Sequence, residues 1–379
     1  MVRRVVVVVS AAAALLYLLW AVQDGQAPPR TDWTAFDNAA DRVFDGTEVY
    51  RVWDAETEEF PYLYPPFALW LAVPLRLGGL YLSWVIAGSI TAIALGVGLS
   101  HATSLATGHI NRMTALVVAA TSGSFLMSVM LGQYGGMYLL SFGLAIWLWS
   151  NDRQFAAGIA LAILCMKPNI AIAVPVVLLW SRSWRAAQGF VVGGLLTVVL
   201  SLPFGIGLWP DFVSNAVDMG QRQLDGQLFE SRTISIAGGF EALTGAGLDD
   251  TSAIVVWLLT TAILGLATLV VWHPTQLAGN PDRAFGVLAV FVIAANTRMY
   301  FYDGAVAVAG VMILWLYSER VGNARLSRQI AWLAGLVWVL SWGSLVHSLN
   351  AFFGLAAGAV VVVVGLDAVH SARQSALVP

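Results

Sequence analysis

The chain has 379 residues, of which 59% are hydrophobic and only 11% are charged. A formal net charge of -3 gives no sign of a nucleic-acid partner, and a single cysteine, Cys165, excludes disulfides and a thiolate metal site within one chain. Apolar runs long enough to cross about 30 Å of hydrocarbon recur along the sequence, without the alternation typical of barrel strands. The sequence therefore predicts an all-α, polytopic membrane protein.

The first apolar run, residues 5–22, follows Arg3 and Arg4. Such an arrangement is typical of a signal peptide or of a membrane anchor. We expect an uncleaved anchor, because the run is long for the apolar part of a signal peptide and further spans follow it.

The polar segment 23–66 comes directly after this run and is densely acidic. It holds ten of the 22 acidic residues of the chain, among them Asp32, Asp37, Asp41, Asp45, Glu48, Asp54, Glu56, Glu58 and Glu59. Carboxylates therefore gather at one face of the membrane, as in a reaction site at a membrane surface.

Two short helices are expected within this first loop. Residues 34–44 suit an amphipathic helix with Asp32 or Thr34 as its cap and Gly46 as its stop. Residues 64–74 are apolar but only half a span long, and prolines bound them at both ends. We expect this second helix to lie in the outer interface instead of crossing the membrane.

Twelve membrane spans are expected over a single membrane domain, 1–379. The stretch 155–181 is interrupted by Lys167, Pro168 and Asn169. Proline removes a backbone donor and lysine is costly in mid-bilayer, so we expect two broken helices that open onto a polar cavity. The spans lie at about 5–22, 80–100, 113–131, 134–150, 155–166, 169–181, 187–207, 252–272, 284–297, 303–318, 329–346 and 350–368.

Basic residues in short loops predict the orientation. With the N-terminus inside, the inner connections carry Arg112, Arg153, Arg182, Arg185, Arg320, Arg325, Arg328 and Arg373. The outer face then holds two long loops, 23–79 and 208–251, and the short connections 132–133, 167–168, 298–302 and 347–349.

The first outer loop offers Asp32 or Asp37 as a candidate general base. A carboxylate held at the membrane surface can take a proton from a hydroxyl nucleophile, and partial burial raises its pKa toward a useful value. The alternative is a helix cap or a solvated loop acid.

Gln133 and Lys167 each interrupt an apolar stretch. Gln133 lies in a glycine-rich break between two spans and suits either a ligand contact or a hairpin turn with a capping amide. An ionisable group inside an apolar run is a functional-site hypothesis for Lys167, and the alternative is a lysine that extends to the outer interface.

Three arginines, Arg222, Arg232 and Arg298, fall in predicted outer connections, where basic residues are scarce. They suggest anion binding, since a guanidinium matches phosphate oxygens, and pairing with the acidic first loop is the alternative. The sequence has no P-loop, no dinucleotide fingerprint and no His-Glu-x-x-His motif. Chemistry driven by a cytoplasmic nucleotide is therefore not expected.

Several short fragments, taken in order, resemble glycosyltransferase family 87 of the GT-C membrane glycosyltransferases, which contains polyprenol-phosphate-mannose-dependent α-mannosyltransferases. Their order and spacing carry the resemblance over residues 30–190, and the second half is similar only through Tyr302-Asp303 and its helix layout. Asn169 and the segment before Tyr302 depart from the family pattern. The fragments are Asp32-Trp33-Thr34-Ala35-Phe36, Gly46 with Val49-Tyr50, Leu63-Tyr64-Pro65-Pro66-Phe67-Ala68, Leu131-Gly132-Gln133, Ala157-Gly158 with Ala160-Leu161, Lys167-Pro168 and Arg182-Ser183-Trp184-Arg185.

This resemblance implies a GT-C fold with inverting transfer of a hexose, above all mannose, at the outer face of a bacterial inner membrane. It implies a polyprenyl-phosphate sugar as donor, a lipid-linked or glycan hydroxyl as acceptor, and Asp32 as the base. No motif requires a cofactor or metal, although some GT-C relatives use a metal and the clustered acids have suitable ligand atoms. By charge and predicted side, we assign Lys167, Arg222, Arg232 and Arg298 to the donor phosphate and Asp37, Tyr64, Gln133, Tyr302 and Asp303 to sugar or acceptor.

Two other classes of protein fit parts of this pattern. A transporter or lipid-linked-sugar flippase would use Lys167-Pro168 as a midplane substrate site, and a scaffold subunit would tolerate the loss of the Asp32 carboxylate. We favour the enzyme, because residues 1–190 and 190–379 show no self-similarity and the acidic first loop has no evident role in a transporter.

Overall fold

The computed structural model describes residues 32–50, 61–76, 79–102, 109–224, 233–297, 299–343 and 347–376. These residues form helices and no strand, apart from an isolated antiparallel bridge between Thr233 and Tyr300. The predicted all-α class is therefore confirmed. The expected anchor at 5–22 lies outside the described residues.

The helices of the first half are α2 (Asp32–Asp45), η1 (Pro66–Ala68), α3 (Leu69–Arg76), α4 (Gly79–Ala102), α5 (His109–Ala120), α6 (Gly123–Met130), α7 (Gly135–Ser150), α8 (Gln154–Leu161), η2 (Ala162–Met166), α9 (Pro168–Ala171) and α10 (Ala173–Trp180). Those of the second half are α11 (Trp184–Ser201), η3 (Leu202–Phe204), α12 (Leu208–Leu224), α13 (Ile236–Thr244), α14 (Thr251–Val271), α15 (Pro274–Leu277), α16 (Pro281–Ala294), η5 (Phe301–Asp303), α17 (Gly304–Arg320), α18 (Ala324–Leu340) and α19 (His347–Ala376).

Four helical stretches of the described residues are long and apolar enough to cross a membrane: Trp184–Phe204, Thr251–Val271, Phe301–Arg320 and Phe352–Gln374. A fifth is counted if the bent pair Arg112–Ala120 and Gly123–Met130 is one span. The remaining apolar helices, such as Gly135–Ser150 and Pro168–Trp180, are shorter. The expected count of twelve spans is thus not confirmed.

The helix expected over 113–131 is broken in the structure. α5 and α6 meet at an angle of 55°, and Ser122 caps α6 by accepting a hydrogen bond from the N–H of Phe125. Ser122 thus provides a partner for one N–H group that a new helix start leaves open. α6 therefore approaches the Gly132 turn from a direction that a straight span would not have.

The two short helices of the first loop are present, with different limits. α2 already begins at Asp32, so Thr34 lies in its first turn and is not the cap. Gly46 ends it as expected, with φ +66° and a hydrogen bond from the N–H of Thr47 to the carbonyl of Arg42. The second helix passes through Pro74 and ends at Arg76, so Pro74 does not stop it.

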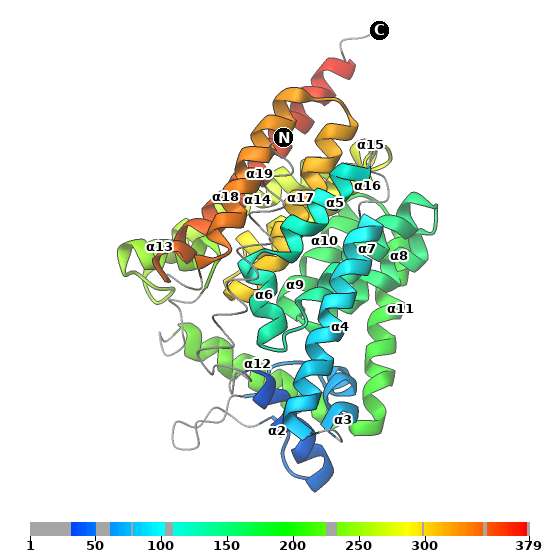
Figure 1. The fold of residues 1–379 in the computed structure, drawn as a ribbon, viewed down its shortest axis with the longest axis vertical. Coiled ribbons are helices and arrows are strands. Elements are labelled where there is room, and N and C mark those ends of the chain that lie inside the picture. The colour runs from blue at the N-terminus through cyan, green and yellow to red at the C-terminus, as the bar shows by residue number, and fades with distance from the viewer. Residues whose placement is uncertain are drawn as a thin grey trace.

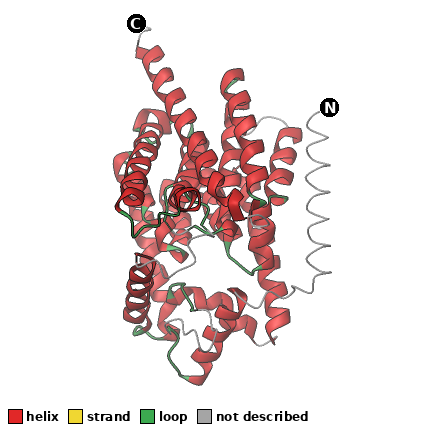
Figure 2. Ribbon diagram, turned by 90° about the vertical axis from the view of Figure 1, so that its left-hand side faces the viewer, coloured by secondary structure: helices red, strands yellow, loops and turns green. Residues whose placement is uncertain are grey.

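The helices pack along the long axis of the molecule, as two views at right angles show (Figures 1 and 2). α2, α3 and α12 lie together at the lower end of Figure 1, and the C-terminus lies at the upper end. α16 and α17 run through the interior, and 83% of the most apolar window of Phe301–Arg320 is buried. We call the end with α2 the loop end and the opposite end the C-terminal end.

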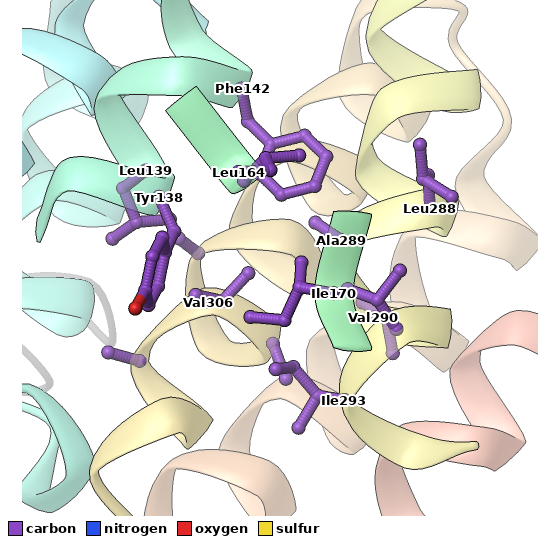
Figure 3. Packing of buried hydrophobic residues seen from close by; sticks show 14 of the residues in the cluster. Tyr138, Leu139, Phe142, Leu164, Ile170, Leu288, Ala289, Val290, Ile293 and Val306 are labelled. Atoms are coloured by element: carbon purple, nitrogen blue, oxygen red, sulfur yellow. The ribbon is translucent and has the colours of Figure 1, made fainter. Parts of the chain in front are cut away.

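The core holds the broken helix in place. Ile170 of α9 is fully buried and packs among Val290 and Ile293 of α16 and Val306 of α17 (Figure 3). Because α9 has only four residues, this burial fixes a segment that could not form a stable helix alone. The position of Lys167, directly before α9, follows from this packing.

Candidate active site

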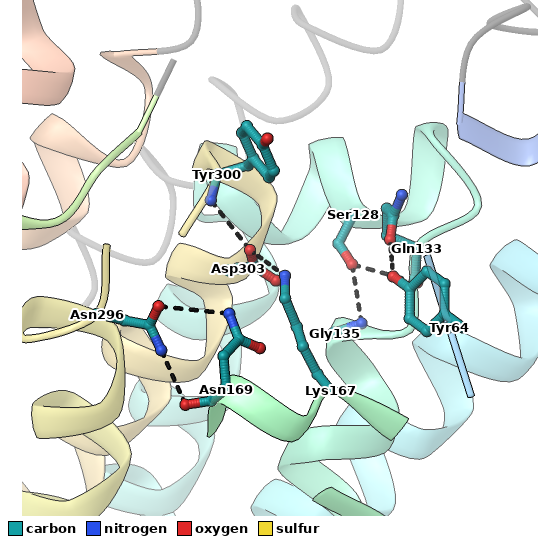
Figure 4. Close-up of polar contacts among 9 residues, drawn as sticks. All are labelled: Tyr64, Ser128, Gln133, Gly135, Lys167, Asn169, Asn296, Tyr300 and Asp303. Atoms are coloured by element: carbon teal, nitrogen blue, oxygen red, sulfur yellow. Dashed lines mark hydrogen bonds and ion pairs between the residues drawn. The ribbon is translucent and has the colours of Figure 1, made fainter. Parts of the chain in front are cut away.

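The backbone changes direction sharply at Lys167. η2 ends at Met166, Lys167 has φ -133° and ψ 87°, and α9 begins at Pro168. Proline lacks an N–H, so it fits the first turn of a helix and does not continue the preceding one. The expected interruption is therefore confirmed, and it turns the lysine side chain toward the connection between α16 and α17 (Figure 4).

Lys167 and Asp303 form an ion pair. The Nζ atom of Lys167 lies 2.5 Å from Oδ2 of Asp303, and the two side chains are 14% and 2% exposed. The same Oδ2 atom accepts a hydrogen bond of 3.0 Å from the N–H of Tyr300. Nζ also lies 5.4 Å from the ring centroid of Tyr302, a favourable distance for a cation over an aromatic ring.

A pair of asparagines lies beside this ion pair. The side-chain amide of Asn169 donates to the Oδ1 of Asn296 at 3.3 Å, and the amide of Asn296 donates to the carbonyl of Asn169 at 2.8 Å. Asn296 thus ties the end of α16 to the start of α9. The sequence places Asn169 in the interruption of 155–181 and shows it as a departure from the family pattern, but nothing local to Asn296 indicates its partner 127 residues away.

A second polar group lies at the turn between α6 and α7. The hydroxyl of Tyr64 donates to Oε1 of Gln133, whose side chain is buried. The turn is closed by Gly132, with φ +69°, and by Ser128, whose Oγ accepts from the N–H of Gly135 at 3.2 Å. Sequence reasoning had missed Ser128.

Gly135 joins the two polar groups. A Cβ atom at this position would lie 2.6 Å from the Oγ of Ser128 and 3.7 Å from the carbonyl oxygen of Tyr302. The Tyr302 carbonyl is thus at ordinary van der Waals distance, and the turn lies directly beside η5. The Tyr64–Gln133 and Lys167–Asp303 pairs therefore belong to one polar region, which we call the central polar cluster.

Helix α2 packs directly against this cluster. A Cβ at Gly132 would lie 2.9 Å from the ring of Trp33, and Phe36 lies 4.7 Å from Tyr64 between ring centroids. Asp32 is the first residue of α2 and immediately precedes Trp33, although its side chain lies outside what the structure describes. Asp37 is on the same helix and is 9% exposed.

Of the three predicted arginines, only Arg222 lies among the described residues, and it pairs outside the central polar cluster. Arg222, on α12, pairs with Asp218 one turn earlier at 2.9 Å, and both side chains are partly exposed. Such a pair contributes little stability. Arg232 and Arg298 lie outside the described residues, next in sequence to segments that are joined by the hydrogen bond from the N–H of Ile234 to the carbonyl of Met299.

The comparison with protein families identifies the family of the chain. The sequence model of glycosyltransferase family 87 matches residues 62–297, more than half of the chain. The chain belongs to this family. No curated protein and no solved structure matches it.

The family 87 match covers part of the central polar cluster. It includes Tyr64, Gln133 and Lys167 and ends before Tyr302 and Asp303. The match reaches further into the second half than the fragments over 30–190 had indicated. Asp32 and Asp37 precede it, so the candidate base is supported by its position on α2 and by the fragments at 32–36.

The packing around the central polar cluster also involves the first loop and α12. The amide of Asn215 on α12 donates to the carbonyl of Tyr62 at 3.2 Å, and Phe212 packs on Tyr50 at 5.7 Å between ring centroids. Burial, and the nearby negative charge of Asp211, raise the pKa of Tyr50, and burial likewise raises the pKa of Tyr62. Both phenols therefore stay protonated at physiological pH and serve only as neutral hydrogen-bonding groups.

Residues suited to a metal are few in the part of the chain that the structure describes. No group of three or more His, Cys, Asp or Glu side chains comes together there. The acids Asp54, Glu56, Glu58 and Glu59 lie outside the described residues. The chemistry that the described cluster offers is a single ammonium beside a carboxylate, with amide and hydroxyl groups around it.

Proposed function

We propose that the protein transfers a hexose, most specifically mannose, from a polyprenyl-phosphate sugar to the hydroxyl of a lipid-linked or glycan acceptor. The reaction takes place at the outer face of the cytoplasmic membrane and inverts the anomeric carbon. The observation that carries this proposal is the contact of Trp33 with Gly132. It brings the first turn of α2, where Asp32 lies, to the turn that carries Gln133, within the polar region that also holds Lys167.

In the proposed step, the Asp32 carboxylate takes the proton of the acceptor hydroxyl. The acceptor oxygen forms a bond to the anomeric carbon while the bond from that carbon to the phosphate oxygen breaks. The leaving group is the polyprenyl phosphate, which departs with the electron pair of the broken bond. The donor sugar is thus joined to the acceptor, and a proton remains on Asp32 for release to water.

Lys167 stabilises the negative charge that develops on the leaving phosphate. An ammonium group has three N–H donors, and the Asp303 carboxylate takes up the shortest contact. The remaining donors are free in direction to meet phosphate oxygens, while Asp303 holds the lysine in place. We therefore assign Asp303 as the positioning residue of Lys167 in addition to its predicted contact with substrate.

Membership of family 87 supports transfer of a glycosyl group. The order of the polar groups supports an acceptor on one side of the sugar and the phosphate on the other. Tyr64 and Gln133 lie between the α2 side and the Lys167 side of the cluster, through the Gly135 contact. A sugar held there would have the acceptor oxygen on the Asp32 side and the phosphate on the Lys167 side. Inversion requires attack from the side opposite the leaving phosphate, and this order of groups is compatible with such an attack.

The test is transfer of radiolabelled mannose from polyprenyl-phosphate mannose to a lipid extract of the source cell by the purified protein. The variant Asp32→Asn should lower turnover about 10²- to 10⁴-fold, because the amide cannot accept the hydroxyl proton. Asp45→Asn is the matched control, since Asp45 lies on the same helix and is exposed. It should keep wild-type turnover.

Equal turnover by wild type and Asp32→Asn, with the same melting temperature, would remove Asp32 as the base. No transfer by the wild type from any polyprenyl-phosphate hexose would remove the proposed reaction itself.

A further inference from the structure

Aromatic rings from three segments pack together beneath α2. The ring centroid of Phe36 lies 5.6 Å from that of Tyr62 and 4.9 Å from that of Tyr134. Tyr134 also contacts Tyr64 at 5.7 Å. We call Tyr62 and Tyr134 the tyrosine cluster.

The hydroxyl groups of the tyrosine cluster are buried without ordinary hydrogen bonds. Both residues are 1% exposed, and neither hydroxyl oxygen makes a hydrogen bond with the described part of the chain. Buried polar groups are paired in the great majority of cases, because an unpaired one carries a desolvation penalty. Two such hydroxyls in one place therefore call for a partner from outside the chain.

A neighbouring tyrosine shows that missing hydrogen bonds are not general among the buried phenols of this region. The hydroxyl of Tyr50 is buried too, but it donates to the carbonyl of Tyr64 at 2.8 Å. Its ring packs on Tyr62 at 5.7 Å between centroids. The missing hydrogen bonds thus distinguish the tyrosine cluster from the tyrosine that packs beside it.

The tyrosine cluster lies beside the Tyr64–Gln133 pair of the central polar cluster. Tyr134 follows Gln133 directly in the chain, and the rings of Tyr62 and Tyr134 lie 6.1 Å and 5.7 Å from that of Tyr64 between centroids. The tyrosine cluster therefore borders the part of the site that we assign to the sugar.

We propose that the tyrosine cluster binds ring hydroxyls of a hexose, either the sugar of the donor or a sugar of the acceptor. This inference rests on the proposed function and names the residues that would hold its sugar. A phenol both donates and accepts a hydrogen bond, and the faces of aromatic rings offer apolar surface to the C–H groups of a sugar. The Phe36 side chain packs on the rings of Tyr62 and Tyr134, and it turns aside to admit the sugar while α2 keeps its contact with Gly132.

The experiment compares Tyr62→Phe and Tyr134→Phe with the wild type in the transfer assay and in thermal unfolding. Each substitution removes only a hydroxyl that lacks a protein partner. We expect an unchanged or raised melting temperature together with a fall of about tenfold in kcat/KM, the size of one lost hydrogen bond. Tyr50→Phe is the matched control, and it should lower the melting temperature because its hydroxyl is paired.

Varying one substrate at a time identifies the source of the sugar. A raised KM for the polyprenyl-phosphate sugar assigns the cluster to the donor, and a raised KM for the acceptor assigns it to the acceptor.

Wild-type kinetics in both variants would overturn the inference while leaving the proposed function intact, and a lowered melting temperature with wild-type kinetics would assign the hydroxyls to the fold. Failure of the wild type to transfer sugar would overturn the proposed function and, with it, this inference.

Discussion

Two largely buried ion pairs lie at opposite ends of α17 and differ in the number of hydrogen bonds that their cations make. Toward the C-terminal end, Arg320 meets both carboxylate oxygens of Asp282, at 2.8 and 3.0 Å, and donates to Asn280 at 3.2 Å. Toward the loop end, Lys167 meets one oxygen of Asp303. The Arg320 guanidinium donates to three oxygens, whereas the Lys167 ammonium contacts one carboxylate oxygen among the described residues and so retains donors.

The backbone around the two pairs differs in the same way. Asp282 is in the first turn of α16 and Arg320 in the last turn of α17, where an acid and a base favour the helix dipoles. Lys167 lies between two helices and Asp303 at the end of a short 3-10 helix. Regular geometry with saturated hydrogen bonds indicates a structural pair, and irregular geometry with spare donors indicates a site.

The largest expected effect is on Lys167. Lys167→Met should lower kcat about 10²- to 10³-fold, because it removes the charge that stabilises the leaving phosphate. The double variant Lys167→Met/Asp303→Asn removes the carboxylate left unpaired, so it should recover stability but not activity. Recovery of activity in the double variant would show that Lys167 serves only to neutralise Asp303.

Arg320→Met should act on stability alone. Loss of one partner of a buried pair costs about 3 kcal/mol, since Asp282 would keep an uncompensated charge. The melting temperature should fall, and the kcat of the folded fraction should match that of the wild type. A fall in kcat comparable with that of Lys167→Met would end the distinction between the two pairs.

Two glycines with the same backbone conformation allow a second comparison between the site and the rest of the molecule. Gly132 and Gly322 both have φ +69°, but a Cβ at Gly132 would meet Trp33 and a Cβ at Gly322 would meet nothing within 4 Å. Each substitution by alanine should cost about 1 kcal/mol of backbone strain. Only Gly132→Ala should also displace α2 and reduce transfer, measured as kcat/KM. Equal activity of the two variants would show that the position of α2 does not affect the reaction.

The smallest expected effect is at Asn296. Asn296→Ala removes two hydrogen bonds that fix the start of α9, and it should raise the KM for the donor several-fold through a less well positioned Lys167. Asn280→Ala, at the other pair, should leave KM unchanged. A KM that rises equally in both variants would point to a general loss of stability.

The sequence predicted the features that depend on local chemistry. The stop of α2 at Gly46 follows from the left-handed conformation that glycine adopts, and the break at Lys167 follows from the adjacent proline. The family was also predictable, because short fragments keep their order along the chain.

The sequence did not predict contacts between distant residues. Charge alone assigned Lys167 to phosphate and Asp303 to sugar, yet the two side chains pair with each other across 136 residues. The bend at Ser122 was missed because an apolar run does not reveal where a capping serine interrupts it. The functional roles of Asp32, Arg232 and Arg298 stay predictions, as do those of all the other predicted site residues.

The central claim is that α2 and the central polar cluster form a site on the outer side of the membrane. Labelling with a membrane-impermeant maleimide tests it most directly, in a Cys165→Ser background that carries either Asp45→Cys or Ala324→Cys, both at exposed positions. We predict that Asp45→Cys is labelled in intact spheroplasts and Ala324→Cys only after permeabilisation. Labelling of Ala324→Cys but not Asp45→Cys in intact spheroplasts would contradict the account.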